Sequence, residues 1–510
     1  MSTTVEPRPD DTVIAERPRP GAPRPYEFPA VASHQLSNGL SILVANLPGR
    51  PLVSASVVIR SGASEEPADV AGSTVLAARA LSEGTERFDA IQLVEATERL
   101  GASLHAEAGW DAFSASVDVP ADRLAPALEL VAEILLRPTF PTSEVERLRD
   151  ERLNDLLQAQ ADPRRRAEQA FADTIYASAS PYHRPSGGTR ETVERLTATD
   201  LRRAYERSLD PRRATLVVAG DLGGQDVVEL AERMFGSWRA SGPVRSSGSI
   251  VDTAASNHRT VRVVHRPGSV QTEIRIGHRG LPRQIPDFHA VSVMSAILGG
   301  LFNSRLNMKL REEKGYTYGA SAGFDLRRGA GPFAARAAVN TEVTVAATLD
   351  TLAELTRMRD QPVETSELVA ARDFLVGVFP LRFETAGAVV GALAGLAVHG
   401  LPLDELIGYR ARIEAVDGAA VAVAAQAHLL VDSAAIVLVG DIDAFGSELE
   451  AAGLGSILIE RDEIVAAPVP LDSEEVVPGP VDREDEEGPT AGAEEPTLPG
   501  GPVERAVEDR

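Results

Sequence analysis

The stretch Ala214-Thr-Leu-Val-Val-Ala-Gly-Asp221-Leu222 occurs a second time in the chain, as Ala434-Ala-Ile-Val-Leu-Val-Gly-Asp441-Ile442. Each copy is a short, mainly apolar run that ends in Gly-Asp, which is typical of a buried strand followed by a turn. The two copies start 220 residues apart. Because a fixed offset is the signature of an internal repeat, this stretch indicates that one fold is built twice.

Two further pairs of segments keep nearly the same offset. Thr142-Ser143-Glu144 and Thr365-Ser366-Glu367 both follow apolar stretches, and both have the composition of a helix N-cap. The strand-like run from Val53 to Ile59 matches the run from Val270 to Ile276. Three matches in the same order predict two similarly folded halves.

Composition sets the limits of these halves. The chain has 510 residues, of which 43% are hydrophobic and 25% charged, so it is long enough for two soluble domains. We predict five parts: a disordered Pro-rich segment at 1–28, an N-terminal domain at 29–240, a Ser- and Gly-rich linker at 241–257, a C-terminal domain at 258–466 and a disordered acidic tail at 467–510.

Each half mixes strand and helix patterns. Strand-like runs such as Leu40 to Ala45 precede segments of helical period such as Arg123 to Leu136. The run from Tyr316 to Phe324 and the run from Gly331 to Val339 form a predicted hairpin, which favours antiparallel pairing. The predicted class is α+β, with two tandem domains that each contain a mixed, mainly antiparallel sheet packed with helices.

Several functions are disfavoured by composition. The absence of Cys excludes disulfides, thiolate metal sites and a thiol nucleophile. A net charge of -24 disfavours nucleic acids and anionic membranes as partners. Neither a signal-like apolar segment near the N-terminus nor a continuous apolar run of about 18 residues is present, so we expect a soluble, cytoplasmic protein. The triplet Arg164-Arg165-Arg166 is predicted to be a solvated helix face.

The ordered motifs resemble the pitrilysin or insulinase-like zinc peptidases (peptidase family M16), in particular their bacterial processing-peptidase-like branch. The motifs are Leu36-Ser-Asn-Gly-Leu40, Glu83-Gly84-Thr85, Pro181-Tyr-His183, Ile297-Leu-Gly-Gly300, Ser304-Arg305-Leu306, Leu310-Arg311-Glu312 and Gly315-Tyr316-Thr-Tyr318. The resemblance implies the tandem metallohydrolase fold shared by LuxS and the mitochondrial processing peptidase.

Active relatives carry H-x-x-E-H on their first helix, in which two His bind zinc and the Glu polarises water. The resemblance places Val75, Ala78 and Arg79 at these positions, and a third ligand at Asp155 or, as the second choice, Glu151. Val and Ala have no donor atoms, and a guanidinium is a fixed cation. The nine His, at positions 34, 105, 183, 258, 265, 278, 289, 399 and 428, include no pair three or four residues apart. We therefore expect no metal or other cofactor on this chain.

The second half differs from the first, because it keeps the residues that the family uses there. In relatives that bear zinc, an Arg and a Tyr of the C-terminal domain reach the active site, where they hold the substrate backbone and stabilise the tetrahedral intermediate. The resemblance assigns these roles to Arg311 and Tyr318, and Tyr316 and Tyr318 are predicted to lie on one face of a strand. The alternative is that Arg311 pairs with Glu312 or Glu313 of its own helix and that Tyr318 only packs.

Three functional hypotheses follow. The first is a metal-free, substrate-binding subunit, inactive alone, of a heterodimeric zinc metalloendopeptidase. Its partner would carry H-x-x-E-H and the zinc, and the pair would cleave short unfolded peptides held as added strands. The second is a scaffold or peptide-binding protein of the same fold without proteolysis. The third is an active peptidase whose zinc ligands lie elsewhere.

Overall fold

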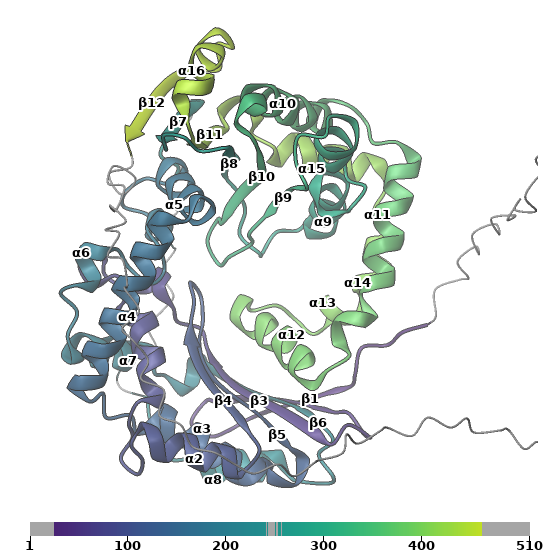
Figure 1. The fold of residues 1–510 in the computed structure, drawn as a ribbon. Coiled ribbons are helices and arrows are strands. Elements are labelled where there is room, and N and C mark those ends of the chain that lie inside the picture. Colours follow the sequence, from purple (N-terminus) through teal and green to yellow (C-terminus); the bar gives the residue numbers. More distant parts are fainter. Residues whose placement is uncertain (1–24, 241, 243–249, 251–252, 257, 462–510) are drawn as a thin grey trace, which may run out of the picture. The chain divides into compact units, whose positions relative to one another are not determined.

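The computed structural model describes residues 25–240, 242, 250, 253–256 and 258–461 (Figure 1). The predicted tail at 467–510 and most of the predicted N-terminal segment lie outside these residues. The last residues of that segment are described and packed, since the ring of Phe28 meets Phe383 edge-on with centroids 5.0 Å apart. The packed part of the chain therefore begins before residue 29.

The N-terminal half contains a six-stranded sheet. Its strands are β1 (Val31–Gln35), β2 (Ser41–Asn46), β3 (Leu52–Ile59), β4 (Ser103–Ala108), β5 (Phe113–Pro120) and β6 (Ala214–Gly220). They lie in the order β1-β2-β6-β3-β5-β4, and every neighbouring pair is antiparallel except β2 and β6. The repeat strand β6 lies inside the sheet, where its apolar side chains are buried.

The C-terminal half repeats this arrangement except at one edge, where the strand comes from the end of the half and is parallel to its neighbour. Its strands are β7 (Thr260–His265), β8 (Gln271–Arg279), β9 (Ala320–Phe324), β10 (Pro332–Asn340), β11 (Ala435–Gly440) and β12 (Ser456–Arg461). The order is β12-β7-β11-β8-β10-β9, with β7 parallel to both β11 and β12. The repeat strands β6 and β11 occupy corresponding places, and β9 and β10 form the predicted antiparallel pair. The predicted α+β class with two similar halves is confirmed.

Helices cover both sheets. In the N-terminal half they are α1 (Ser73–Arg79), α2 (Ala90–Arg99), α3 (Leu124–Leu136), α4 (Thr142–Ala161), α5 (Pro163–Ile175), α6 (Arg190–Val193), α7 (Ala198–Ser208) and α8 (Val227–Phe235). In the C-terminal half they are α9 (Phe288–Ser295), α10 (Thr344–Asp360), α11 (Thr365–Val378), α12 (Ala386–His399), α13 (Asp404–Ile407), α14 (Tyr409–Glu414), α15 (Gly418–His428) and α16 (Ile442–Ala451). Two π-helical turns, η7 (Ala296–Gly300) and η8 (Asn307–Glu313), follow α9.

The two halves exchange a helix (Figure 1). Helix α5 of the N-terminal half packs on β7, β8 and β11, where Phe171 joins a buried cluster with Val437 and Val439. Helix α12 of the C-terminal half packs on β3 and β6, and its Leu393 shares a core with Val217. The two helices start 223 residues apart, so equivalent helices of the repeat cross in opposite directions.

One surface prediction is wrong. Arg166, in the triplet predicted to be a solvated face, is buried, and it pairs with Glu460 of β12. The reason is the crossing of α5, which turns this side of the helix toward the second sheet. A buried guanidinium needs an acidic partner, and β12 supplies it.

Within the described ranges, no single helix is long and apolar enough to cross a membrane. The segments Thr365–Phe383 and Ala386–His399 together pass the length and composition test, but they are bent by 112°.

Candidate functional site

Helix α1 carries the positions that the family resemblance assigns to the zinc motif, and hydrogen bonds hold its first turn in place. The Glu66 carboxylate accepts hydrogen bonds from the backbone N–H groups of Gly72, at 2.7 Å, and Thr74, at 3.1 Å. Gly72 has a φ of 95°, and a Cβ there would approach the carbonyl oxygen of Gly187 to 2.7 Å, so only Gly fits. Burial raises the pKa of Glu66, against these hydrogen bonds.

An ion pair stands at the motif itself. Ala78 is fully buried in the core and Val75 is partly exposed, and neither hydrocarbon side chain has a donor atom. Arg79 points outward, and its Nη2 donates to Glu151 Oε2 of α4 at 2.9 Å. Arg79, at the predicted position of the second His, thus forms an ion pair with Glu151, at the less favoured position of the third ligand. The positive charge at this place belongs to a protein side chain.

Asp155, the favoured third-ligand position, is also engaged by cations. Arg152 and Arg165 both donate to its carboxylate, Arg165 at 2.7 Å. Burial opposes ionisation, but the hydrogen bond from Arg165 and the charges of both guanidinium groups hold the pKa of Asp155 below its usual value. The carboxylate is charged and its oxygens are occupied by protein donors, so the residues here do not fit a zinc ion.

Among the described residues, one other group of side chains has metal-like spacing: His265, Asp441 and Asp443. The repeat explains it without a metal. His265 Nδ1 accepts from the N–H of Ile442, and Asp441 accepts from the N–H of Gly268. In the first half, Asn46 and Asp221 accept from the N–H groups of Leu222 and Gly49 in the same pattern. Because an Asn performs the same task there, the group serves as a turn cap.

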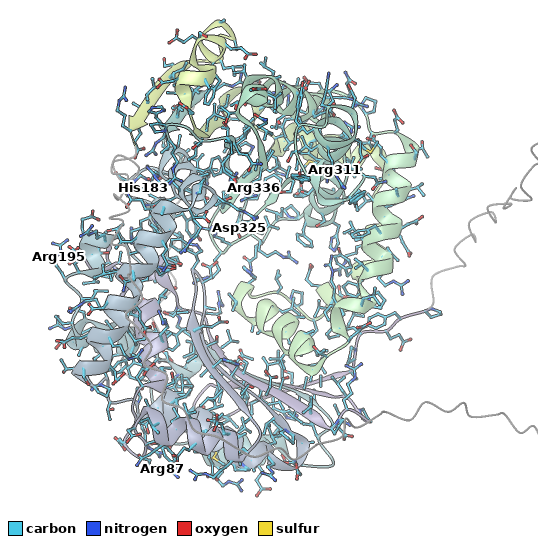
Figure 2. All side chains as sticks on the ribbon, viewed as in Figure 1. Arg87, His183, Arg195, Arg311, Asp325 and Arg336 are labelled. Carbon is cyan, nitrogen blue, oxygen red and sulfur yellow. The ribbon has the colours of Figure 1, made fainter. Side chains whose placement is uncertain are left out.

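Arg311, labelled in Figure 2, lies in η8. Its guanidinium stacks 4.4 Å from the ring centroid of the exposed Phe302. The carboxylate nearest to it is that of Glu312, at 3.6 Å, which is too long for a hydrogen bond. The Arg311 donors are therefore accessible. The alternative in which Arg311 is bound by its own helix is realised only as this loose contact.

Tyr318 is 95% exposed. Two sequence expectations about it were wrong. Strand β9 begins at Ala320, so Tyr316 and Tyr318 lie in the loop before the strand and not on its face. Tyr318 also does not pack, whereas Tyr316 contacts the C-terminal core. The loop turns at Gly315, whose φ is 66°, and this turn ends the helical segment that carries Arg311.

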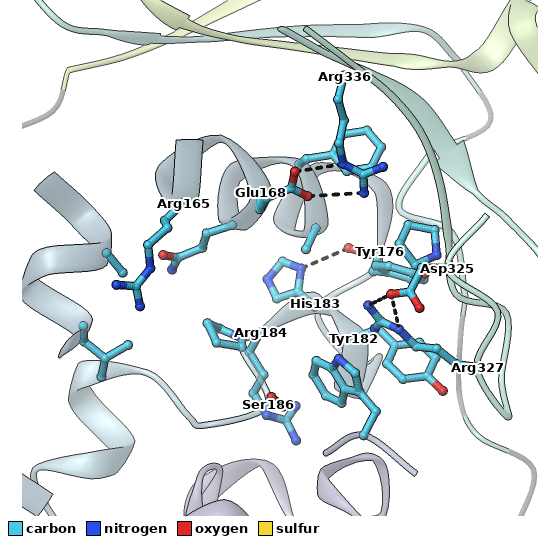
Figure 3. Close-up of a pocket in the computed structure, with 18 of the residues that line it drawn as sticks. Arg165, Glu168, Tyr176, Tyr182, His183, Arg184, Ser186, Asp325, Arg327 and Arg336 are labelled. Carbon is cyan, nitrogen blue, oxygen red and sulfur yellow. Dashed lines mark hydrogen bonds and ion pairs between the residues drawn. The ribbon is translucent and has the colours of Figure 1, made fainter. Parts of the chain in front are cut away.

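A pocket of about 360 Å³ lies beside α5 (Figure 3). Its walls come from α4, α5, the 176–186 segment and the β9–β10 hairpin, and His183, Asp325 and Arg336 meet there (Figure 2). Our sequence reasoning missed it, although Pro181-Tyr-His183 was one of the motifs. Nothing in the sequence indicated that α5 would cross to the second sheet and carry these residues together.

Comparisons with known proteins agree with this architecture. Residues 41–185 match the family described as Insulinase (Peptidase family M16), and residues 195–375 match the Peptidase M16 inactive domain. An uncharacterized zinc protease of Mycobacterium leprae is 28% identical over 310 residues, which cover 59% of this chain and 68% of the relative. The non-peptidase homolog YmxG of Helicobacter pylori is 22% identical over 362 residues, covering 69% of this chain and 81% of the relative.

Solved structures share the fold. A peptidase M16 inactive domain from Pseudomonas fluorescens superposes with a TM-score of 0.75 at 25% identity, over 81% of this chain and 98% of that one. A protease from Helicobacter pylori has the same TM-score at 19% identity and is covered completely, which speaks for the fold alone.

Proposed function

Because the chain belongs to peptidase family M16 and lacks the H-x-x-E-H motif, we propose that it is the metal-free subunit of a heterodimeric zinc peptidase. The observation that carries the proposal is a contrast between the two halves. The zinc position of the first half is closed by the Arg79–Glu151 pair, whereas in the second half Tyr318 is exposed and Arg311 has only a loose contact with Glu312.

The exposed donors suit the transition state of peptide hydrolysis. A guanidinium offers fixed N–H donors to a carbonyl or carboxylate, and a phenol donates to a developing oxyanion. In this proposal a partner with H-x-x-E-H holds zinc and activates water, while Arg311 and Tyr318 hold the substrate backbone. The zinc is the partner's, and this chain binds no cofactor.

Short unfolded peptides are the proposed substrates. Strands β4 and β9 are edge strands of their sheets, although the Ala320 N–H of β9 already donates to Asn307. An extended peptide can add to an uncovered edge through main-chain hydrogen bonds. This mode places little demand on peptide sequence.

A scaffold function without proteolysis is the second candidate. It is favoured by the relative named a non-peptidase homolog, whose match covers more of this chain than that of the Mycobacterium leprae protein. An oxyanion donor has no use in a scaffold, so the retention of both Arg311 and Tyr318 supports the peptidase subunit.

The test is co-purification of the tagged chain from its native cell, followed by mass spectrometry and hydrolysis of a quenched fluorescent peptide. We expect a one-to-one complex with an H-x-x-E-H protein that cleaves the peptide only as a pair. A chain that purifies alone, or within a larger non-proteolytic complex, would favour the scaffold. One tightly bound zinc per isolated chain would instead show that the chain has a metal site of its own.

A further inference from the structure

The pocket beside α5 has an apolar wall and a cationic wall. Trp110, Phe171 and Tyr182 contribute rings, and the cations are Arg152, Arg165, Arg184, Arg327 and Arg336. Two acids, Glu168 and Asp325, also line it. On a chain with a net charge of -24, this is a local excess of positive charge.

The acids of the pocket are already engaged. Glu168 Oε1 accepts from Arg336 Nε at 2.9 Å and from Arg275 Nε at 2.7 Å. Burial opposes ionisation of Glu168, but these two guanidinium groups hold its pKa below the usual value. Asp325 accepts two hydrogen bonds from Arg327, whose guanidinium also lies 4.7 Å from the Tyr182 ring centroid. These pairs fix the walls and leave no acid free for another cation.

Arg184 is the cation without a carboxylate. It is partly buried, and it forms no ion pair with any residue that the structure describes; its closest polar contact is the backbone oxygen of Glu66, at 3.5 Å. The Glu66 carboxylate is bound to the start of α1 instead. Burial lowers the pKa of Arg184, and Glu66 offsets this in part. A partly buried guanidinium that makes no direct ion pair attracts an anion from solution.

His183 lies next to Arg184 and faces the pocket (Figure 3). Its Nδ1 lies 3.0 Å from the backbone oxygen of Tyr176, which makes Nδ1 the protonated nitrogen of the neutral ring. Its Nε2 then carries a lone pair and accepts a hydrogen bond. The pocket thus offers an anion site and a neighbouring acceptor, beside aromatic rings.

We infer that this pocket binds the C-terminal residue of a peptide, with the terminal carboxylate on Arg184 and the last amide N–H on His183 Nε2. The side chain of that residue, apolar or aromatic, lies against the partly exposed ring of Trp110, which packs edge-on against the buried Tyr182. Arg165, across the pocket in Figure 3, adds positive potential while it remains bonded to Asp155. The choice of a peptide as ligand rests on the proposed function; the anion site rests on the pocket alone.

The test uses the isolated chain and two peptides, acetyl-Ala-Ala-Ala-Phe as the free acid and as the C-terminal amide. Trp110 reports binding by fluorescence in a Trp238→Phe background, since Trp238 is buried away from the pocket in the N-terminal core. We expect the acid to bind about 10- to 100-fold more tightly than the amide, as loss of one charge-assisted pair implies. Arg184→Gln should abolish this preference.

The matched control is Arg203→Gln on α7, whose side chain is 72% exposed, and it should leave both affinities unchanged. If Arg184→Gln fails to fold, Arg165→Gln replaces it, because Arg165 is half exposed and should weaken acid binding several-fold. Three results would each overturn the inference. One is equal affinity for the acid and the amide, and another is competition by inorganic phosphate as strong as that by the peptide acid. The third is binding of 3-phenylpropionate without binding of the peptide acid. Since no zinc-bearing partner is present, failure here is distinct from failure of the co-purification experiment.

Discussion

Arg79 of α1 and Glu151 of α4 form an ion pair with an Nη2–Oε2 distance of 2.9 Å, at the positions that the family resemblance assigns to the second zinc-binding His and the less favoured third ligand. Both side chains are more than 40% exposed, so the pair itself contributes only about 0–1 kcal/mol. Its importance is chemical. The positive charge that a metal would supply is provided by a side chain that exchanges no ligands and activates no water.

Restoring the motif letters should therefore not restore the metal. In the variant Val75→His, Ala78→Glu, Arg79→His, the introduced carboxylate enters the fully buried site of Ala78 without a partner, at a cost of about 3 kcal/mol. Asp155 remains bonded to two Arg residues. We expect a lowered melting temperature and less than one zinc per chain after dialysis. Stoichiometric, tightly held zinc would contradict this account of the site.

Arg311→Ala should lower the peptidase turnover of the assembled pair by about tenfold to a thousandfold, as loss of one transition-state donor does. The melting temperature should change little, because the guanidinium only stacks on the exposed Phe302. Lys314→Ala is the matched control: it removes a nearby exposed cation and should leave turnover unchanged. Steady-state kinetics of the pair decide, and normal turnover in Arg311→Ala would remove Arg311 from the mechanism.

The helix exchange predicts a long-range effect of Phe171→Ala. Phe171 belongs to the N-terminal half but packs on Val437 and Val439, so its truncation should cost about 3–5 kcal/mol and speed amide exchange in β11. Phe235→Ala is the control, because Phe235 is equally buried but packs only within the N-terminal core. Hydrogen exchange by mass spectrometry should separate the two variants. Equal protection of β11 in both would contradict the packing.

His278 should make the protein lose stability in acid. It is 6% exposed, and its Nδ1 lies 2.8 Å from the backbone oxygen of Arg279, while its Nε2 accepts from the N–H of Leu430. Burial lowers the pKa of His278 to about 4, so the folded state favours the neutral ring. The unfolded chain takes up a proton near pH 6.5, and the folded chain does so only near pH 4.

The contribution of His278 is thus fully present above about pH 6.5 and is lost as the pH falls toward 4, by up to about 3 kcal/mol. In His278→Gln, urea denaturation should show a smaller loss of unfolding free energy between pH 7 and pH 4 than in the unmodified chain. Parallel pH profiles for the two proteins would mean that this ring does not titrate as described.

The repeat made the two-sheet architecture predictable, because the sequences of β6 and β11 both have the composition of a buried strand and the same Gly-Asp ending. The crossing of α5 and α12 was not predictable in the same way. A stripe of small residues such as Ala167 and Ala170 shows that a helix is buried but not which sheet buries it. The wrong prediction of an exposed Arg166 has the same cause, because the sequence does not show which sheet α5 packs on.

At the candidate site, once the family resemblance places the zinc motif at Val75, Ala78 and Arg79, residue types alone argue against zinc, since no geometry makes Val75 or Ala78 a ligand. The position of Tyr318 could not. Alternation in Tyr316-Thr-Tyr318 fits a strand, but the turn at Gly315 and the late start of β9 place both rings before the sheet. The local sequence pattern shows the alternation typical of a strand, but the hydrogen bonds of the folded sheet determine at which residue the strand begins.

The exchange of α5 and α12 also determines what each half would be on its own. An isolated N-terminal half would lack the helix that covers β3 and β6, and its own α5 would expose Phe171 and Ala170 to water. Cutting the chain within 241–257 would therefore leave two fragments that remain bound to each other, because each fragment contributes a helix to the hydrophobic core of the other. The linker connects the two halves covalently, and the packing of the exchanged helices α5 and α12 holds the two halves together.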